Sequence, residues 1–372
     1  MRSSALRPFG ILPDGTAVDS WRLTDSSGAQ ATILAYGATL QELTTPDRDG
    51  RIANVVLGFS ELSDYIERAA YYGCVVGRYA NRIAGGTFAL DGREIRLPLN
   101  DGPRPNTLHG GTPGFGARLW TAPDGIVEVG DANGADGAAG ADGAAGTSLT
   151  LTRVSPDGEE GFPGELTVSI RYTLAAGRLT LDYRAETTAP TVLNLSNHAR
   201  FNLAGEGVGN VLDHELTVAA DGFLPVDEAL IPLDGAAPVA GTPFDFRTPT
   251  PVGARLADPH PQLETVGGYD HCFVLRGGRT AVPRPVVTLR DPASGRTMQI
   301  ATTEPGLQLY LSSELDGTLT GLGGRPYEQY GGIVLETQHF PDSPHRPDYP
   351  STVLLPGRSF TSTTVYAFGV RT

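Results

Sequence analysis

The chain has 372 residues and a net charge of -14, and all 28 of its basic residues are arginine. A surface this acidic repels the phosphates of nucleic acids and of anionic membranes, so neither kind of partner is expected. The absence of lysine excludes a lysine Schiff base and a P-loop nucleotide site, because both require a lysine amine.

Turn signals are spread along the whole chain, and helical periodicity is weak. The 48 glycines and 29 prolines lie in motifs such as DG, GG and PDG, which are typical of many short strands joined by tight turns. A short helix is predicted over residues 60–67. The chain is therefore expected to be almost entirely β.

Residues 130–148 form a low-complexity segment rich in Ala, Asp and Gly. The segment lacks an apolar anchor, which predicts a disordered surface loop between two strands. A linker between domains is the alternative interpretation. Calcium binding by the repeated aspartates is not favoured, because the spacing lacks the closing glutamate of an EF-hand loop.

Alternating apolar residues predict two hairpins and a closing strand. In the first hairpin, residues 166–174 and 179–183 flank a turn at 175–177, and in the second, residues 286–290 and 297–302 flank the turn DPASG. Residues 360–370 are rich in threonine and aromatics, which favours a last strand. These elements predict an antiparallel β-sandwich in a single domain over residues 1–372.

The two cysteines, Cys74 and Cys272, are far apart and form neither a CxxC motif nor a metal-binding spacing. We expect both to be reduced and buried, as in a cytosolic protein. The chain has no apolar run long enough for a signal peptide or a membrane span. A soluble, cytoplasmic protein is therefore predicted.

Four motifs concentrate polar side chains on glycine-rich or strand-like segments. In chain order they are GRYANRIAGGTFALDG (77–92), NTLHGG (106–111), NLSNHARFNL (194–203) and GGIVLETQHFPDSP (331–344). Glycine lets the backbone approach a small ligand closely, and a histidine among amides can have a pKa near neutrality. The motifs predict a site for a small polar molecule.

Three side chains could carry acid–base chemistry, and each has a structural alternative. His109 and His198 lie in the second and third motifs, although a lone histidine is more often structural than catalytic. Glu336 follows the apolar strand Gly332-Ile333-Val334-Leu335, where a carboxylate costs free energy unless it is paired or used. A salt bridge to an arginine is its alternative role.

Together the four motifs, in this order, resemble the aldose 1-epimerases, also called galactose mutarotases. The resemblance runs from about residue 9 to the C-terminus. It implies a large antiparallel β-supersandwich that interconverts the α and β anomers of free aldoses such as galactose and glucose. It also implies a monosaccharide substrate, no cofactor, no metal, and a monomer or homodimer.

The resemblance further implies roles for seven residues. Glu336 would be the general base toward the sugar O1, His198 the general acid toward the ring oxygen, and His109 a further hydrogen-bonding partner there. Asn81, Arg82 and Asp270 would bind the sugar hydroxyls, and Gln308 would make a further polar contact near the base. In these roles Glu336 starts ionised and His198 starts protonated. The rate should therefore fall at low pH as Glu336 gains a proton and at high pH as His198 loses one, which gives a bell-shaped pH–rate profile with an acid and an alkaline limb.

The chain departs from the family pattern beside the expected acid. After His198 it carries Ala199-Arg200-Phe201, where relatives commonly have Ser-Tyr-Phe. This change bears on the preferred sugar more than on the reaction. Separately, three alternative functions stay open. One is a hexose-6-phosphate 1-epimerase, which would need an arginine cluster that includes Arg82 and Arg200. The others are a non-catalytic sugar-binding protein and a retaining glycosidase that uses Asp270 and Glu336.

Overall fold

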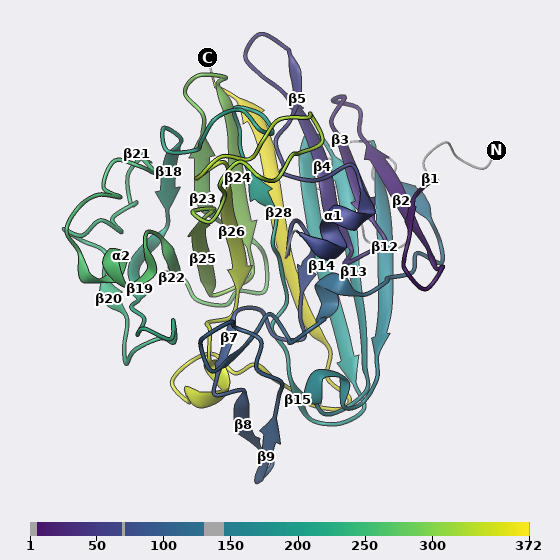
Figure 1. Cartoon of the computed structure of the whole chain (residues 1–372), viewed down its shortest axis with the longest axis vertical. Coiled ribbons are helices and arrows are strands. Elements are labelled where there is room, and N and C mark those ends of the chain that lie inside the picture. The colour runs from purple at the N-terminus through teal and green to yellow at the C-terminus, as the bar shows by residue number, and fades with distance from the viewer. Residues whose placement is uncertain (1–5, 69–70, 130–144, 372) are drawn as a thin grey trace.

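Antiparallel strands form nearly all of the secondary structure in the computed structural model, which describes residues 6–68, 71–129 and 145–371 (Figure 1). Three sheets carry most of these strands. The nine-stranded sheet has the order β11 (Ile126–Val129), β12 (Gly146–Ser155), β13 (Leu166–Ala175), β14 (Arg178–Thr187), β28 (Phe360–Val370), β24 (Arg296–Thr302), β23 (Arg284–Arg290), β18 (Glu215–Val218) and β21 (Thr250–Pro251).

A six-stranded and a five-stranded sheet complete the main framework. The six-stranded sheet has the order β17 (Arg200–Phe201), β26 (Ile333–Gln338), β25 (Gly306–Leu311), β22 (Asp270–Leu275), β19 (Ala220–Leu224) and β20 (Ala237–Pro238). The five-stranded sheet runs in chain order through β1 (Leu6–Ile11), β2 (Ala17–Thr24), β3 (Gln30–Leu34), β4 (Thr39–Pro46) and β5 (Ile52–Asn54).

Short strand pairs and helices connect these sheets. The pairs are β6 (Val75–Val76) with β16 (Ser196–Asn197), β7 (Arg82–Ala84) with β10 (Asn106–Leu108), β8 (Thr87–Leu90) with β9 (Arg93–Arg96), and β15 (Thr191–Val192) with β27 (Val353–Leu354). The β8–β9 hairpin projects at the bottom of Figure 1. The α-helices are α1 (Leu62–Glu67), which confirms the predicted helix, and α2 (Pro261–Val266), and single 3₁₀ turns lie at Phe115–Ala117, Glu159–Gly161 and Ser343–His345.

The predicted hairpins form as expected because one face of each strand is apolar. The side chains of Leu166, Val168, Ile170, Tyr172 and Leu174 are all fully buried, and they belong to a core cluster that draws on all three large sheets. Ala176 and Gly177 have φ of 52° and 68°, as a two-residue type I′ turn requires. The second hairpin is β23–β24, and β28 joins the two hairpins by pairing with β14 and β24. The predicted antiparallel β-sandwich is confirmed.

Two details differ from the sequence prediction. The last residues of the predicted loop at 130–148, residues 146–148, belong to strand β12 and pair with β11 and β13. Residues 130–144 lie outside the described residues. Glu336 lies within β26, rather than after its end.

The two cysteines are free and buried, as predicted. Neither of the two α-helices in the described part of the chain has the length and apolar character that crossing a membrane would require.

Candidate active site

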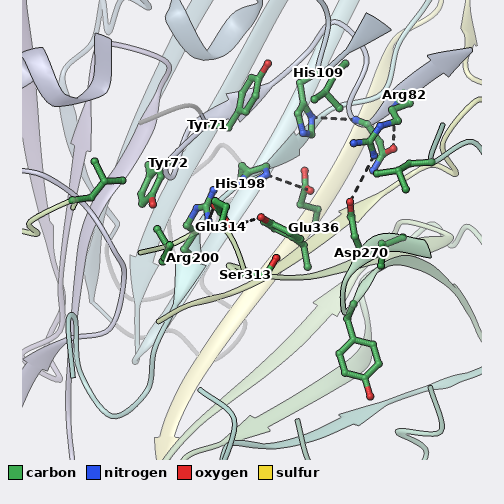
Figure 2. A pocket seen from close by; sticks show the side chains of 18 of the residues that line it. Tyr71, Tyr72, Arg82, His109, His198, Arg200, Asp270, Ser313, Glu314 and Glu336 are labelled. Carbon is green, nitrogen blue, oxygen red and sulfur yellow. Dashed lines mark hydrogen bonds and ion pairs between the residues drawn. The ribbon is translucent and has the colours of Figure 1, made fainter. Parts of the chain in front are cut away.

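Polar side chains from segments far apart in the sequence, between Arg68 and Glu336, line a cavity of about 640 Å³. His109, His198 and Glu336 lie together in it, as Figure 2 shows. Of the predicted sugar ligands, Asn81, Arg82 and Asp270 also line the cavity. Gln308 lies behind them, where its Nε2 donates a hydrogen bond to Asp270 Oδ1 at 2.6 Å.

The register of the six-stranded sheet explains why these residues meet. Glu336 on β26 pairs with Gln308 on β25. Val334 lies two residues before Glu336 on the same face of β26, and it pairs with Arg200 on β17 and with Tyr310 on β25. Tyr310 in turn pairs with Asp270, the first residue of β22. Because residues i and i+2 of a strand face the same way, the two rows present their side chains to one side of the sheet.

Glu336 and His198 contact each other at the base of the cavity. The Nε2 atom of His198 lies 3.7 Å from Glu336 Oε1, and the two side chains are 7% and 2% exposed. Within the described residues, neither His198 Nδ1 nor Glu336 Oε2 has a hydrogen-bond partner. Both residues line the cavity, so a polar ligand bound there can supply partners for unpaired buried atoms.

Burial shifts the protonation of this pair away from the charged forms. It raises the pKa of Glu336 to about 8, and Asp270 adds to the rise, whereas Arg200 and Arg82 oppose it. Burial also lowers the pKa of His198 well below its ordinary value, and His109 and Arg200 lower it further. Near neutral pH the free protein therefore holds a protonated Glu336 and a neutral His198, which is the reverse of the starting state expected from the sequence.

The tautomer of His109 is fixed by the backbone. Its Nδ1 accepts a hydrogen bond from the Asn81 N–H at 3.2 Å, so in the neutral ring the proton is on Nε2. Burial lowers the pKa of His109 to about 3, and Arg82 contributes to the shift, so the ring is neutral at physiological pH. His109 can therefore only donate a hydrogen bond into the cavity through Nε2.

Arg82 is held in place by two carboxylates. Its Nε donates to Asp101 Oδ2 at 2.8 Å, and its Nη1 lies 3.8 Å from Asp270 Oδ2. Hydrogen bonds from Arg104 and Arg82 keep the pKa of Asp101 below its ordinary value although burial alone would raise it. The guanidinium thus reaches the cavity in a fixed orientation, as a ligand for hydroxyl groups requires.

His109, His198 and Glu336 also have the spacing of a metal site. The ligand atoms of His109, His198 and Glu336 lie within 4.8 Å of one another. However, a histidine binds a metal through an unprotonated nitrogen, and the backbone hydrogen bond places the proton of His109 on the nitrogen that faces the cavity. The arrangement therefore fits hydrogen bonding to a neutral ligand better than it fits a cation.

Several cavity residues were not predicted from the sequence. The ring of Tyr71 lies 4.6 Å from that of His109, and Tyr72 and Glu314 surround Arg200. Asp101, which anchors Arg82, was also missed. These residues lie outside the motifs, and only the fold brings them to the site.

Comparisons with known proteins show the family to which the chain belongs. The family model described as "Aldose 1-epimerase" matches residues 19–367. The "Galactose mutarotase" of Sus scrofa is 43% identical over 363 residues, covering 97% of each chain. The "Aldose 1-epimerase" of Escherichia coli K12 is 35% identical and covers 96% of this chain and 97% of that protein.

A solved structure shows the same fold. The galactose 1-epimerase from Lactobacillus acidophilus aligns with a TM-score of 0.80 and 28% identity, covering 99% of this chain and 98% of that one. The match thus extends over nearly the whole of both chains. This chain belongs to the aldose 1-epimerase family and is an enzyme of that isomerase class.

Proposed function

We propose that Glu336 and His198 exchange protons with O1 and the ring oxygen of a free aldose, such as galactose or glucose, and so interconvert its α and β anomers. The observation that carries this proposal is the buried contact between the two side chains at the base of a polar cavity. An acid and a base side by side are what ring opening and closure require, because no atom other than hydrogen is transferred.

The proposed cycle has one proton entering and one leaving the sugar. Glu336 takes the proton of the O1 hydroxyl while His198 gives a proton to the ring oxygen, and the C1–O5 bond breaks to leave the open-chain aldehyde. Rotation about the C1–C2 bond presents the other face of the carbonyl. The reverse transfers then close the ring as the other anomer and restore both side chains.

The free enzyme starts this cycle with the proton on Glu336, and sugar binding supports its transfer to His198. The two arrangements of the pair contain the same single proton, so they are tautomers of one protonation state. A hydrogen bond donated by O1–H favours the ionised carboxylate, and a ring oxygen that accepts a hydrogen bond favours the protonated imidazole. The bound sugar therefore stabilises the reactive tautomer.

The other predicted residues would position the sugar. His109 is a fixed donor toward the ring oxygen, because Asn81 holds its proton on Nε2. Arg82 and Asp270 offer a donor and an acceptor to ring hydroxyls, and Gln308 orients Asp270 through its 2.6 Å hydrogen bond. Such preorganised contacts hold the anomeric carbon over the acid–base pair.

The charge balance of the cavity favours an unphosphorylated sugar. Its four arginines already have acidic partners: Arg68 pairs with Asp64, Arg82 and Arg104 with Asp101, and Arg200 with Glu314. A phosphate would have to compete with these carboxylates. We therefore propose a neutral monosaccharide substrate, with no nucleic-acid or membrane partner, for a cytoplasmic monomer or homodimer. The two free buried cysteines and the net charge of -14 support this context.

Polarimetry tests the proposed reaction. Freshly dissolved α-galactose and α-glucose should reach anomeric equilibrium faster with the protein than without it. Glucose 6-phosphate is the control substrate and should be accelerated much less. A rate equal to the spontaneous rate for both free sugars would refute the proposal.

A further inference from the structure

Arg200 is a buried cation on the same sheet face as Glu336, and it takes no direct part in the proposed proton cycle. Its Nη1 donates to Ser312 Oγ at 2.8 Å and lies 2.5 Å from Glu314 Oε1. The guanidinium carbon lies 4.2 Å from the centroid of the Tyr72 ring and 5.7 Å from that of Tyr310. The side chain is 5% exposed, so its charge is fixed in position.

Strand pairing places this charge beside Glu336. Arg200 is the register partner of Val334, and Glu336 is the next residue of β26 on that face. Diagonal neighbours of this kind have Cα atoms roughly 7–8 Å apart, and a buried charge acts strongly at such a distance. In Figure 2, Arg200 and Glu314 lie on one side of Glu336, and Arg82 and Asp270 on the other.

The charged partner of Arg200 is only half-buried. The Glu314 side chain is 46% exposed, and it also accepts a hydrogen bond from the hydroxyl of Tyr310. Solvent screens an exposed carboxylate more than a buried guanidinium. Glu314 therefore offsets the charge of Arg200 only in part, and a net positive field remains at the acid–base pair.

Other groups also act on Glu336. The titratable and charged groups that face it or interact with it are His198, His109, Arg82, Asp270, Arg200, Cys74, Cys272, Tyr183 and Tyr366. Burial raises the pKa of both thiols and of both phenols, so these four stay neutral. Arg82 is shared with two carboxylates, which leaves Arg200 as the cation whose counterion is most exposed.

We propose that Arg200 is a positioning residue that sets the pH range over which the Glu336–His198 pair holds a single proton. The inference rests on the proposed function of that pair. A nearby cation disfavours protonation of both side chains, so it moves both limbs of the pH–rate profile toward lower pH. Because both limbs move together, the balance between the tautomer with the proton on Glu336 and the one with the proton on His198 changes little. The main effect is therefore a shift of the profile along the pH axis, with little change in the maximum rate.

Arg200→Met tests this role. The variant removes the charge and keeps a long apolar side chain, so both limbs of the kcat/KM profile should move to higher pH, by roughly one pH unit for a buried charge about 7–8 Å away. Arg200→Lys keeps the charge and should restore most of the wild-type position. If Arg200→Met leaves both limbs in place, or if Arg200→Lys moves them as far as Arg200→Met does, the proposal is wrong.

A second variant gives a shift of opposite sign. Glu314→Gln leaves Arg200 without its counterion, so the limbs should move to lower pH, by a smaller amount because Glu314 is half-exposed. Unspecific damage to the site would not move the two variants in opposite directions. A shift of Glu314→Gln toward higher pH, or no shift, contradicts the proposal even if Arg200→Met fails to fold.

Arg153 offers a matched control outside the cavity. Its side chain is 9% exposed, its Nη1 donates to Glu159 Oε2 at 2.8 Å, and its guanidinium carbon lies 5.0 Å from the Phe115 centroid. Arg153→Met thus removes a similar ion pair and a similar ring contact, and it should leave the limbs in place. A shift equal to that of Arg200→Met would show that loss of any buried arginine moves the profile, and it would overturn the inference.

A measurement without substrate separates this inference from the proposed function. With ¹³C-labelled glutamate, the carboxyl resonance of Glu336 is assigned by its loss in Glu336→Gln and is titrated by NMR. The pH at the midpoint of the Glu336 titration should be higher in Arg200→Met than in the wild type. Absence of mutarotation in the wild type would refute the function alone, whereas an unshifted Glu336 midpoint would refute the role of Arg200 alone.

Discussion

Glu336 Oε1 and His198 Nε2 are 3.7 Å apart at the base of the cavity, although 138 positions separate the two residues in the sequence (336 minus 198). Glu336→Gln keeps the size of the side chain but removes its basicity. We expect kcat for mutarotation to fall at least about 10²-fold, and His198→Asn to cause a similar loss. Because the two residues act in one proton cycle, the double variant should lose much less than the product of the single losses.

His260→Asn is the control for these substitutions. His260 is the N-cap of α2, where its Nδ1 accepts the Gln262 N–H at 3.2 Å, and asparagine is also a favourable N-cap residue. Activity should stay within a few-fold of wild type. Mutarotation by Glu336→Gln at nearly the wild-type rate, measured above the spontaneous background, would contradict the assigned roles.

The pH–rate profile should be bell-shaped, with the limbs assigned opposite to the usual order. As the pH rises through about 8, Glu336 loses the single proton of the pair, so kcat/KM of the free enzyme should fall. As the pH falls well below 6.5, His198 gains a second proton, and the rate should fall again. Stopped-flow polarimetry of wild type and Glu336→Gln checks the assignment, because the residual activity of the variant should lack the alkaline limb.

His109 should remain a neutral Nε2–H donor across the active pH range. Its Nδ1 accepts the Asn81 N–H, and its pKa is about 3. ¹⁵N NMR of labelled histidine should therefore show a protonated Nε2 and an unprotonated Nδ1, with no titration near neutrality. A resonance of the opposite tautomer would remove the basis for His109 as the donor toward the ring oxygen.

Removal of metal ions should leave the activity unchanged. The proton on His109 Nε2 blocks one of the three ligands that a cation between His109, His198 and Glu336 would need. Dialysis against a chelator, followed by polarimetry, checks this expectation. A loss of rate that added zinc or another divalent ion restores would show that the triad holds a metal.

His339→Ala should destabilise the protein without removing its chemistry. His339 Nδ1 lies 2.5 Å from Glu304 Oε2, and both side chains are buried. Loss of the partner leaves a buried carboxylate unpaired, which costs about 3–5 kcal/mol of unfolding free energy. Urea unfolding measures the loss, and the folded variant should keep most of its activity because neither residue lines the cavity.

The pH dependence of that loss has a definite sign. Burial raises the pKa of Glu304, but His339, together with Ser362 and Arg279, outweighs it and holds the pKa below the ordinary value. The Glu304–His339 pair therefore contributes its full stabilisation above the pKa that Glu304 has in the unfolded chain. That stabilisation is lost as the pH falls through the lower pKa of Glu304 in the folded protein. His345→Ala is the control, since His345 is 36% exposed beside Asp342, and it should lose less stability. Equal losses in the two variants would contradict a special role for the buried pair.

The segment between β11 and β12 should be dispensable for activity. Val129 and Gly146 are register partners at the end of this hairpin, so a short turn can join them. Replacing residues 131–144 with a Gly-Ser turn should leave kcat within a few-fold, and loop closure changes by only about 0.6 kcal/mol per doubling of length. A folded variant with most of its activity lost would assign the segment to the site.

The strand pattern of this protein is readable from its sequence because alternation reports burial directly. Leu166 to Leu174 in steps of two are all fully buried, and the predicted closing strand coincides with β28. Glycine at the second position of the type I′ turn identifies the hairpin without knowledge of the remaining chain. The family motifs likewise located Glu336, His198 and His109 through local sequence alone.

Only the tertiary structure decided how these residues behave. Strand register brings Arg200 and Asp270 beside Glu336, and Asp101 reaches Arg82 across a loop, which no local pattern encodes. Burial then reverses the protonation state expected for Glu336 and His198, because desolvation disfavours both charged forms. Residue identity determines which protons a side chain can carry, whereas the solvent and charges around the folded side chain determine when it carries them.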